Sequence, residues 1–365
     1  MQKDCYFITG FPGFLSTQLM KELLVKKKDS EFFVVCIPTM VETAYKSKQF
    51  LMQETGATSD QITIIEGDIT EKNCGIKEPI VTKILNKVTQ VWHLAAIYDL
   101  AVSRDIAFKV NVEGTKMVND LVKRIIQLKR YVYFSTAYVA GERKGPLLEE
   151  ELIKPTSFHN YYEETKFFAE EYVEQLKSTI PTTIIRPGIV KGHSHTGETS
   201  KFDGPYFIMN MLDKLRFLPF LPAVGDGDSY LNIVPFDYVI KASIYFSDQP
   251  TSIGKTYHLT DPNPHTVREV YSSILEEMLN KSPKGKVPLW MVKNALKFKS
   301  VRSYLGVERE AVDYFSWNGD FRSDIAQQDL VGSGIVCPDF IEGVANMVAF
   351  YEQNKQNSDY HIAIH

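Results

Sequence analysis

The chain has 365 residues, which is long for a single hydrophobic core and predicts one large domain with a smaller one. Its formal net charge is -4, and its basic residues are scattered along the sequence, so we expect no nucleic-acid partner. The four cysteines form no Cys-x-x-Cys pair, which predicts no metal site and favours a reducing, cytoplasmic location. No run of about 18 apolar residues occurs, which predicts no membrane partner.

Short runs rich in β-branched and aromatic residues alternate with longer amphipathic stretches as far as residue 187, and the pattern then loosens. This alternation is typical of strand-helix units. We predict an α/β fold with a doubly wound, Rossmann-type parallel sheet. A dinucleotide-binding domain is expected over residues 1-187 plus about 231-262, and a smaller, discontinuous C-terminal substrate subdomain over about 188-230 plus 263-365. The predicted strands are 5-9, 32-37, 62-67, 90-95, 131-136, 182-187 and 255-260.

A glycine-containing turn, TGFPGFLS, follows the first predicted strand and opens the first predicted helix. Gly10 permits a tight turn, and Gly13 lets the backbone approach a pyrophosphate, whose charge the helix N-terminus attracts. An ordinary strand-to-helix turn is the alternative. The position after the first strand of an alternating chain favours the dinucleotide turn.

Two further strand ends carry residues suited to a nucleotide. Asp68 follows the third predicted strand, where its carboxylate could accept a hydrogen bond from an adenine amino group or could simply cap a turn. Ala95 and Ala96 follow the fourth, and their small side chains would let a cofactor lie against the backbone.

Tyr162 and Lys166 are four residues apart in a segment that reads as a helix, so both project from one face. An ammonium beside a phenol favours phenolate, and we expect Lys166 to lower the pKa of Tyr162. Ser135 and Thr136 end the fifth predicted strand, where a hydroxyl could bond the same substrate oxygen. Tyr162 would then exchange a proton with a substrate oxygen as hydride moves to or from a nicotinamide.

In this order, the glycine turn, the strand-end hydroxyl and the helical tyrosine and lysine resemble the extended short-chain dehydrogenase/reductase superfamily. Over essentially the whole chain the sequence is most similar to its fatty acyl-CoA reductase and thioester reductase branch, which has a male sterility-type NAD-binding domain. The segments that carry this resemblance are TGFPGFLS, HLAAIYD, NVEGT, YFSTAYVAG, NYYEETK, RPGIV, NIVPFDYV, FRSDIAQQDL and CPDFIEGV.

The resemblance implies a role for each matching position. The catalytic residues would be Thr136, Tyr162 and Lys166, and the last two would also touch the cofactor. Asn111 would support the site from the fourth helix. The remaining cofactor-binding positions implied are Gly10, Phe11, Gly13, Phe14 and Leu15 for the pyrophosphate, Asp68 and Ile69 for the adenine, Ala95, Ala96, Asn111 and Ser135 beside the ribose and active site, and Pro187, Gly188, Ile189 and Val190 for the nicotinamide.

Two departures from the family pattern bear on the cofactor. Ser16 replaces the last small residue of the glycine motif, which a close helix packing should tolerate. The end of the second predicted strand, CIPT, offers neither the arginine that this branch uses for a 2′-phosphate nor the acidic residue of many NAD enzymes. Lys46 and Lys48 lie downstream and could reach a phosphate. We expect NADP, with NAD as the alternative.

The expected function is that of an NAD(P)-dependent oxidoreductase that reduces a carbonyl or acyl thioester. The expected partner is a small-molecule or acyl-thioester substrate, and the chain could also form a homodimer. An NAD-dependent nucleotide-sugar epimerase and a non-catalytic dinucleotide-binding module are the alternatives. A dehydratase would have an acidic pair after Thr136, where Ala137 and Tyr138 stand. Candidates for an apolar substrate wall are Phe202, Tyr206, Phe207, Met211, Phe217 and Phe220.

Overall fold

The computed structural model describes residues 3-98 and 102-364, so Asp99, the last residue of the segment HLAAIYD, lies outside the described residues. The chain divides into two units, each built from three separate segments. The first comprises Met1–Val139, Tyr161–Arg186 and Ile240–Tyr257, and the second comprises Ala140–Asn160, Pro187–Val239 and His258–His365. The substrate role expected for the second region remains a prediction.

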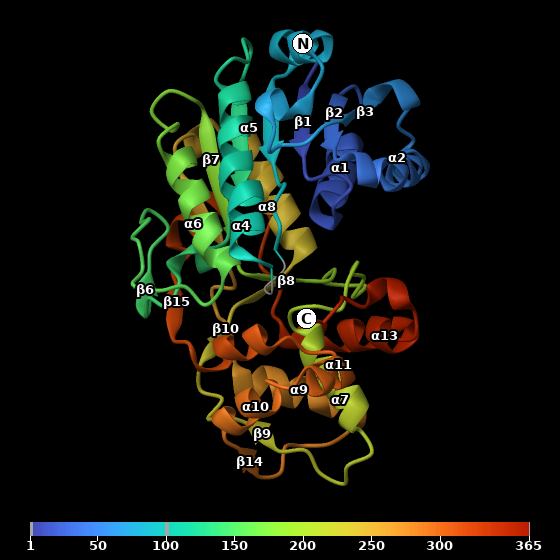
Figure 1. Cartoon of the computed structure of the whole chain (residues 1–365), viewed down its shortest axis with the longest axis vertical. Helices are drawn as coiled ribbons and strands as arrows, with labels where there is room; N and C mark the ends of the chain where they lie inside the picture. Colours follow the sequence, from blue (N-terminus) through green and yellow to red (C-terminus); the bar gives the residue numbers. More distant parts are fainter. Residues whose placement is uncertain (1–2, 99–101, 365) are drawn as a thin grey trace. The chain divides into compact units, whose positions relative to one another are not determined.

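A seven-stranded sheet has the strand order β12-β7-β5-β4-β1-β2-β3, and Figure 1 labels β7, β1, β2 and β3 of it. β1 pairs in parallel with both β2 and β4, so the strand order reverses beside β1. In open α/β sheets, ligands bind at this reversal, beyond the carboxyl ends of the strands. The predicted doubly wound α/β fold is confirmed. The strands of this sheet are β1 Cys5–Thr9, β2 Glu31–Cys36, β3 Ile62–Glu66, β4 Gln90–His93, β5 Arg130–Phe134, β7 Thr182–Pro187 and β12 Thr256–Leu259.

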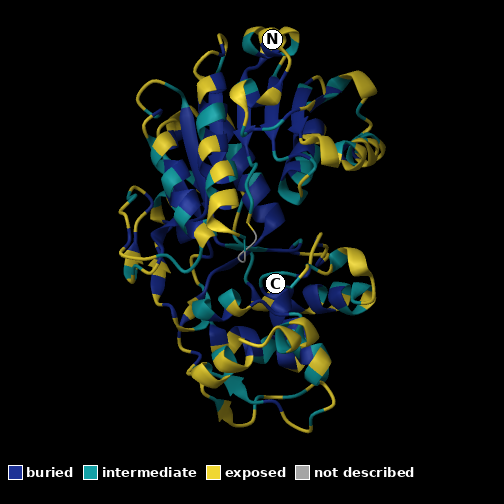
Figure 2. Ribbon diagram, in the orientation of Figure 1, coloured by how far each residue is buried: buried dark blue, intermediate teal, exposed yellow. Residues whose placement is uncertain are grey.

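Both faces of the sheet are buried, which is why its strands read as continuous apolar runs. Phe7, Tyr131 and Tyr133 lie on one face, in a core that also takes Val118 of α5 and Val173 of α6. The neighbouring residues of the strands, which point the other way, are equally inaccessible. Figure 2 shows the strands buried along their length and the helices exposed on their outer sides.

The helices associated with the first unit alternate with its strands, as the sequence pattern predicts. Met20, Leu19 and Leu23 form the buried stripe of the first helix, and Ala169 and Val173 that of α6. Figure 1 shows α5 and α6 lying side by side. These helices are α1 Phe14–Lys26, α2 Val41–Thr55, α3 Glu78–Lys87, α4 Arg104–Ala107, α5 Gly114–Val122, α6 Tyr161–Glu174 and α8 Phe236–Asp248.

The second unit has its own core, in which Phe202, Tyr206 and Ile274 are almost inaccessible to solvent. Its strands form short pairs: β8 with β11, β9 with β14, β10 with β13 and β6 with β15. Its strands are β6 Gly145–Leu147, β8 Ile189–Lys191, β9 Ala223–Val224, β10 Tyr230–Leu231, β11 Ile233–Pro235, β13 His265–Thr266, β14 Lys286–Val287 and β15 Gly319–Phe321. Its helices are α7 Tyr206–Leu215, α9 Val267–Leu279, α10 Leu289–Ala295, α11 Lys299–Leu305, α12 Asp324–Leu330 and α13 Val344–Asn354.

Within residues 3-98 and 102-364, none of the helices combines the length and the apolar character needed to cross a bilayer.

Candidate active site

The turn between β1 and α1 is tight and leaves no room for a side chain at its first glycine. Gly10 has φ +86°, and a Cβ added to it would lie 2.8 Å from the amide nitrogen of Ala95 at the end of β4. The amide of Gly13 donates to the carbonyl of Gly10 at 2.7 Å. No side chain caps the N-terminus of α1. The turn therefore brings helix amides to the strand-order reversal, as a pyrophosphate site requires.

Ser16, the departure in the glycine motif, fits the turn closely. Its side chain is buried, and its hydroxyl lies 2.8 Å from the carbonyl oxygen of Gly10 and 2.9 Å from that of Gly13. The serine hydroxyl therefore stabilises the turn through hydrogen bonds that glycine or alanine at this position would lack.

Asp68 and Ile69 lie beyond the end of β3. One carboxylate oxygen of Asp68 accepts from the amide of Thr70 at 2.8 Å, so part of the carboxylate stabilises its own turn. Ile69 packs so closely on Gly114, the first residue of α5, that a Cβ there would lie 2.8 Å from its Cδ1. The roles of both residues toward an adenine remain predictions.

Asn111 lies in a turn of π-helix, Phe108–Glu113, between α4 and α5. Its side chain is buried and bonds both backbone groups of Ile97, accepting at 2.8 Å and donating at 3.0 Å. The same amide donates to the hydroxyl of Thr165 on α6 at 2.9 Å. Asn111 therefore joins the loop after β4 to the helix of Tyr162, and its donors are used within the protein.

Thr136 and Tyr162 are brought together by the fold. Their side chains form a hydrogen bond, although 26 residues separate them in the sequence. Burial raises the pKa of Tyr162 above its usual value, and the bond with Thr136 opposes that rise only in part. The expected lowering of this pKa is therefore not found. Burial removes the phenolate from water, and the group that opposes this rise is Thr136 and not Lys166. The ammonium group of Lys166 bonds Tyr133 and Phe134 instead.

Lys166 is 3% exposed, and its ammonium group faces β5. Its Nζ donates to the hydroxyl of Tyr133 at 2.8 Å and to the carbonyl of Phe134 at 2.6 Å. Burial lowers the pKa of Lys166 to about 7, and the charge of Glu170 opposes this shift. Tyr133 is therefore the hydrogen-bond partner that makes a buried lysine possible on α6. The sequence did not indicate this partner.

Glu170, four residues after Lys166 on α6, forms a buried ion pair with Arg186. The carboxylate of Glu170 on α6 accepts from Nε of Arg186 at 2.9 Å, and both side chains are almost fully buried. The hydroxyl of Ser135 donates to the other carboxylate oxygen. Ser135 is thus engaged by the protein, and its predicted contact with a cofactor remains a prediction. Glu170 could have been noticed in the sequence, because it stands four residues after Lys166 on the same stripe.

His93 is another residue that sequence reasoning missed. It is buried at the end of β4, 2.7 Å from the hydroxyl of Thr9 and 3.0 Å from that of Thr115. Burial, reinforced by the charge of Lys166, lowers its pKa to about 3, so its imidazole is neutral. The hydroxyl of Thr9 also accepts from the amide of Ala95 at 3.2 Å. These bonds fix the backbone where Ala95 and Ala96 are expected to meet a cofactor.

The segment Pro187–Val190 belongs to the second unit, where β8 pairs with β11. The amide of Ile189 donates to the carbonyl of Asn232 at 2.8 Å, and a Cβ on Gly188 would lie 2.7 Å from the same oxygen. Small size is therefore required at Gly188 for packing. Its role toward a nicotinamide remains a prediction.

The candidates for an apolar substrate wall do not share one environment. Phe202, Tyr206 and Phe207 are buried core residues of the second unit, whereas Phe217 is 71% and Phe220 57% exposed. The buried members are explained by core packing alone.

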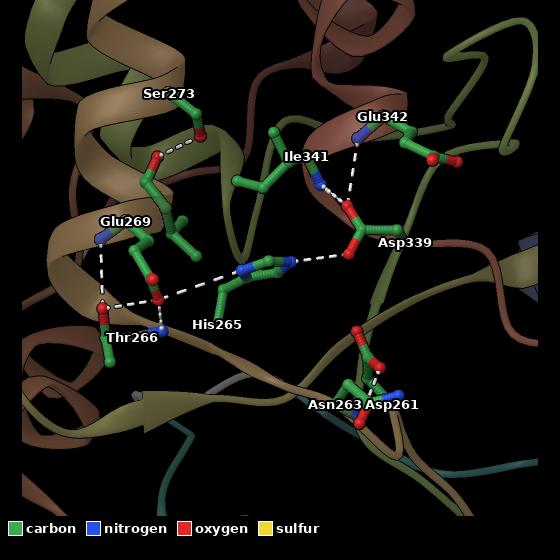
Figure 3. Close-up of polar contacts among 10 residues, drawn as sticks. Asp261, Asn263, His265, Thr266, Glu269, Ser273, Asp339, Ile341 and Glu342 are labelled. Atoms are coloured by element: carbon green, nitrogen blue, oxygen red, sulfur yellow. Dashed lines mark hydrogen bonds and ion pairs between the residues drawn. The ribbon is translucent and has the colours of Figure 1, made fainter.

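A polar cluster in the second unit caps helices and does not resemble a catalytic group (Figure 3). His265 and Asp339 lie 2.8 Å apart, and Asp339 also accepts from the amides of Ile341 and Glu342. Thr266 and Glu269 form a capping box at the start of α9. Each carboxylate is used by a helix start, as capping requires. Among the described residues, no group of His, Cys, Asp or Glu could hold a metal ion.

Comparison with known proteins identifies the family of the chain. A family model described as male sterility protein, an NAD-binding domain, matches residues 8–243. A fatty acyl-CoA reductase of Drosophila melanogaster is 27% identical over 65% of this chain and 52% of its own length. An alcohol-forming fatty acyl-CoA reductase of Simmondsia chinensis is 26% identical over 67% of this chain and 63% of its own length. The chain thus spans just over half to just under two thirds of these relatives.

Among solved structures, the terminal R domain of the myxalamid PKS-NRPS biosynthetic pathway is similar to this chain, with a TM-score of 0.80. The two are 23% identical, and the similarity covers 98% of this chain and 92% of that domain. At this identity the likeness establishes the shared fold, which includes both units.

Proposed function

The chain belongs to the male sterility protein family of NAD-binding domains, and from that premise we propose that it is an NAD(P)H-dependent oxidoreductase that reduces a carbonyl or acyl thioester. The observation that carries the proposal is the hydrogen bond between Tyr162 and Thr136. It joins a buried phenol to a strand-end hydroxyl on the side of the sheet where a dinucleotide is expected. Relatives named fatty acyl-CoA reductases support the acyl thioester as substrate.

Each residue of the site has a definite task in this proposal. The nicotinamide, when bound, supplies the hydride that adds to the carbonyl carbon. Tyr162 gives its proton to the carbonyl oxygen, and Thr136 holds that oxygen through its hydroxyl. With a thioester, these steps give a hemithioacetal; when its hydroxyl proton is lost, the carbon-sulfur bond breaks, the thiolate takes up a proton and leaves as the thiol, and an aldehyde remains. The raised pKa of Tyr162 keeps the phenol protonated, which suits a proton donor in the direction of reduction.

Lys166 lies one helical turn after Tyr162 on α6, and its ammonium group bonds Tyr133 and Phe134 of β5. Burial lowers the pKa of Lys166 and so disfavours its charged form, and a bound ribose would add hydroxyl oxygens as acceptors for its ammonium group. Binding of the cofactor and protonation of Lys166 should therefore favour each other. Glu170, which favours the charged lysine, contributes to the same end.

NADP is the proposed cofactor, with NAD as the alternative. Ile37, Pro38 and Thr39 follow β2, and none of them offers a carboxylate to a ribose 2′-hydroxyl. The lysines downstream give little support for a phosphate site. Lys46 pairs with Glu42 at 2.7 Å, and Lys48 donates to the carbonyls of Ser59 and Ile62. The preference rests on the missing acidic residue alone.

The test is oxidation of NADPH and of NADH by the purified chain in the presence of acyl thioesters, aldehydes and ketones. We expect turnover with at least one acyl thioester or aldehyde and a lower KM for NADPH. Conversion of a uridine nucleotide sugar instead, with NAD that survives purification, would replace the proposal by the epimerase alternative. Cofactor binding with no turnover of any substrate would favour the non-catalytic module.

The proton donor is tested by Tyr162→Phe, with Tyr161→Phe as its control. Tyr161 is the neighbouring residue of α6 and is 45% exposed. We expect Tyr162→Phe to retain cofactor binding and to lower turnover by about a hundredfold or more, as loss of a general acid does. Tyr161→Phe should leave both unchanged. Equal turnover by the two variants would reject the role of Tyr162.

A further inference from the structure

One stretch of the second unit is strongly basic in a chain that is acidic overall. Residues 281-307 contain seven lysines or arginines and no aspartate or glutamate, whereas the whole chain has a net charge of -4. This stretch forms β14, α10 and α11. Such a concentration of one charge creates a local field that attracts anions.

The same stretch exposes large apolar side chains on its outer side. Leu289, Val292 and Leu296 turn inward and pack with Phe207 of α7. Trp290 points outward and is 63% exposed. Phe298 is 66% exposed, and Met291 and Tyr304 are also about half exposed or more. These outer side chains are exposed and bury little area against the core, and a group of exposed large apolar side chains is typical of an interaction surface.

The loop after α7 extends this surface. Phe217 and Phe220 lie in that loop and are 71% and 57% exposed. Nζ of Lys281 donates to the carbonyl of Leu218 at 2.8 Å, and β14 pairs with β9, so the loop and the basic stretch lie together. Figure 1 shows α10 beside the β9 and β14 pair, and Figure 2 shows exposed residues over these elements. We call this surface the basic aromatic face; its apolar members are Phe217, Phe220, Trp290, Met291, Phe298 and Tyr304.

Part of the positive charge of this face is not neutralised within the protein. Lys286 pairs with Asp226, and Lys293 with Asp313 at 2.6 Å. In the part of the chain that the structure describes, Lys284, Lys297 and Lys299 make no ion pair, and all three are exposed. A partner of negative charge would therefore complement the basic aromatic face.

We propose that the basic aromatic face docks the protein on an anionic lipid surface. Exposed tryptophan and phenylalanine among lysines is the composition of segments that lie in the boundary between lipid headgroups and acyl chains. The apolar side chains protrude and come from a loop and two short helices, which suits shallow insertion into a bilayer. The proposal is independent of the proposed reaction and differs from the expectation of no membrane partner, which rested on the scatter of basic residues along the sequence.

Trp290 gives this proposal a direct optical test. Trp92 is fully buried and Trp317 is 5% exposed, so Trp290 is the tryptophan whose surroundings a docking event would change. We expect the full chain to sediment with vesicles of phosphatidylcholine and phosphatidylserine, with a blue shift of tryptophan fluorescence. Trp290→Phe should remove the shift. Vesicles of phosphatidylcholine alone should give neither signal, and added salt should weaken binding because it screens the charges.

Two double variants distinguish binding through the basic aromatic face from non-specific binding to vesicles. The first combines Lys299→Gln with Phe298→Ala, and the second combines Lys77→Gln with Ile126→Ala. The second pair removes one exposed lysine and one exposed apolar side chain from the first unit, where Ile126 is 72% exposed. We expect the first pair to weaken vesicle binding by about fivefold or more, since one surface lysine alone contributes about that factor. The second pair should bind as the unmodified chain does, and both should keep its melting temperature.

Three results would overturn the proposal. The first is no binding of the unmodified chain to phosphatidylserine vesicles. The second is an equal loss of binding in the two double variants. The third is a fluorescence shift of Trp290 with a purified acidic acyl-carrier domain but not with vesicles, which would assign the face to a protein partner.

Discussion

The hydroxyl of Tyr133 accepts a hydrogen bond from Lys166 and should therefore favour the charged lysine, and Tyr133→Phe tests this. The variant keeps the ring that lies 4.3 Å from Nζ and removes the acceptor that lies 2.8 Å from it. A hydrogen bond to a charged group contributes about 1.5–3 kcal/mol. Since one pKa unit corresponds to about 1.4 kcal/mol, the pKa of Lys166 should fall by about one to two units. It would then lie below the value of about 7 in the unmodified chain.

The sign of the accompanying stability change follows from linkage. A lysine whose folded pKa is lowered binds fewer protons folded than unfolded, so its contribution to stability rises with pH between the two values. In the unmodified chain this window runs from about 7 to the ordinary lysine value of 10.5. In Tyr133→Phe the window extends further down. The extra destabilisation due to Lys166 should therefore appear only below about pH 7.

The direct assay is an NMR titration of the Cε resonance of Lys166 in protein labelled at lysine, with Lys166→Arg to assign the signal. Tyr131→Phe is the matched control. Tyr131 lies on the same strand, is equally buried, and donates its hydroxyl to Asn119 at 2.8 Å instead of contacting Lys166. The reasoning is refuted if Lys166 titrates at the same pH in Tyr133→Phe as in the unmodified chain, or if Tyr131→Phe shifts it equally.

Two further substitutions probe the glycine turn and the buried ion pair. Gly10→Ala should lower the affinity for a nicotinamide dinucleotide at least tenfold, because its Cβ would meet Ala95. Gly56→Ala, at φ +72° with no atom within 4 Å, should leave that affinity unchanged. Equal losses of affinity in a fluorescence titration of the two variants would contradict the close-approach argument. Glu170→Gln should lower the free energy of unfolding in urea by about 3–5 kcal/mol, because Arg186 keeps a buried, unpaired charge. Glu42→Gln, which breaks an exposed pair, should leave that free energy unchanged, and a similar result for both would argue against a cost from burial.

The sequence was informative where a signal is local. Periodicity located the strands of the main sheet to within one or two residues at most ends, because a buried parallel strand is a short apolar run. The four-residue spacing of Tyr162 and Lys166 was sufficient to place both on α6, because a helix repeats at that distance. The family relationship came from the order of such local motifs.

Interactions between distant segments could not be read in this way. Nothing in the residues around Lys166 identifies Tyr133 as its partner, because that pairing depends on which strand α6 crosses. The same is true of Arg186, whose place beside Glu170 depends on the position of β7 in the sheet. The basic aromatic face was also missed, since Phe217 and Trp290 are far apart in the sequence and the fold brings their segments together.

The π-helical turn that carries Asn111 makes the site sensitive to length as well as to composition. Such a turn accommodates one more residue than an α-helix would, and each residue advances a helix by about 100°. Deleting a single residue from Phe108–Glu113 would restore a regular helix and leave the faces of α4 and α5 unchanged. Asn111 would then lose the widened turn that carries it, so a shortened homologue with every named side chain intact should lack the bonds from Asn111 to Ile97 and Thr165.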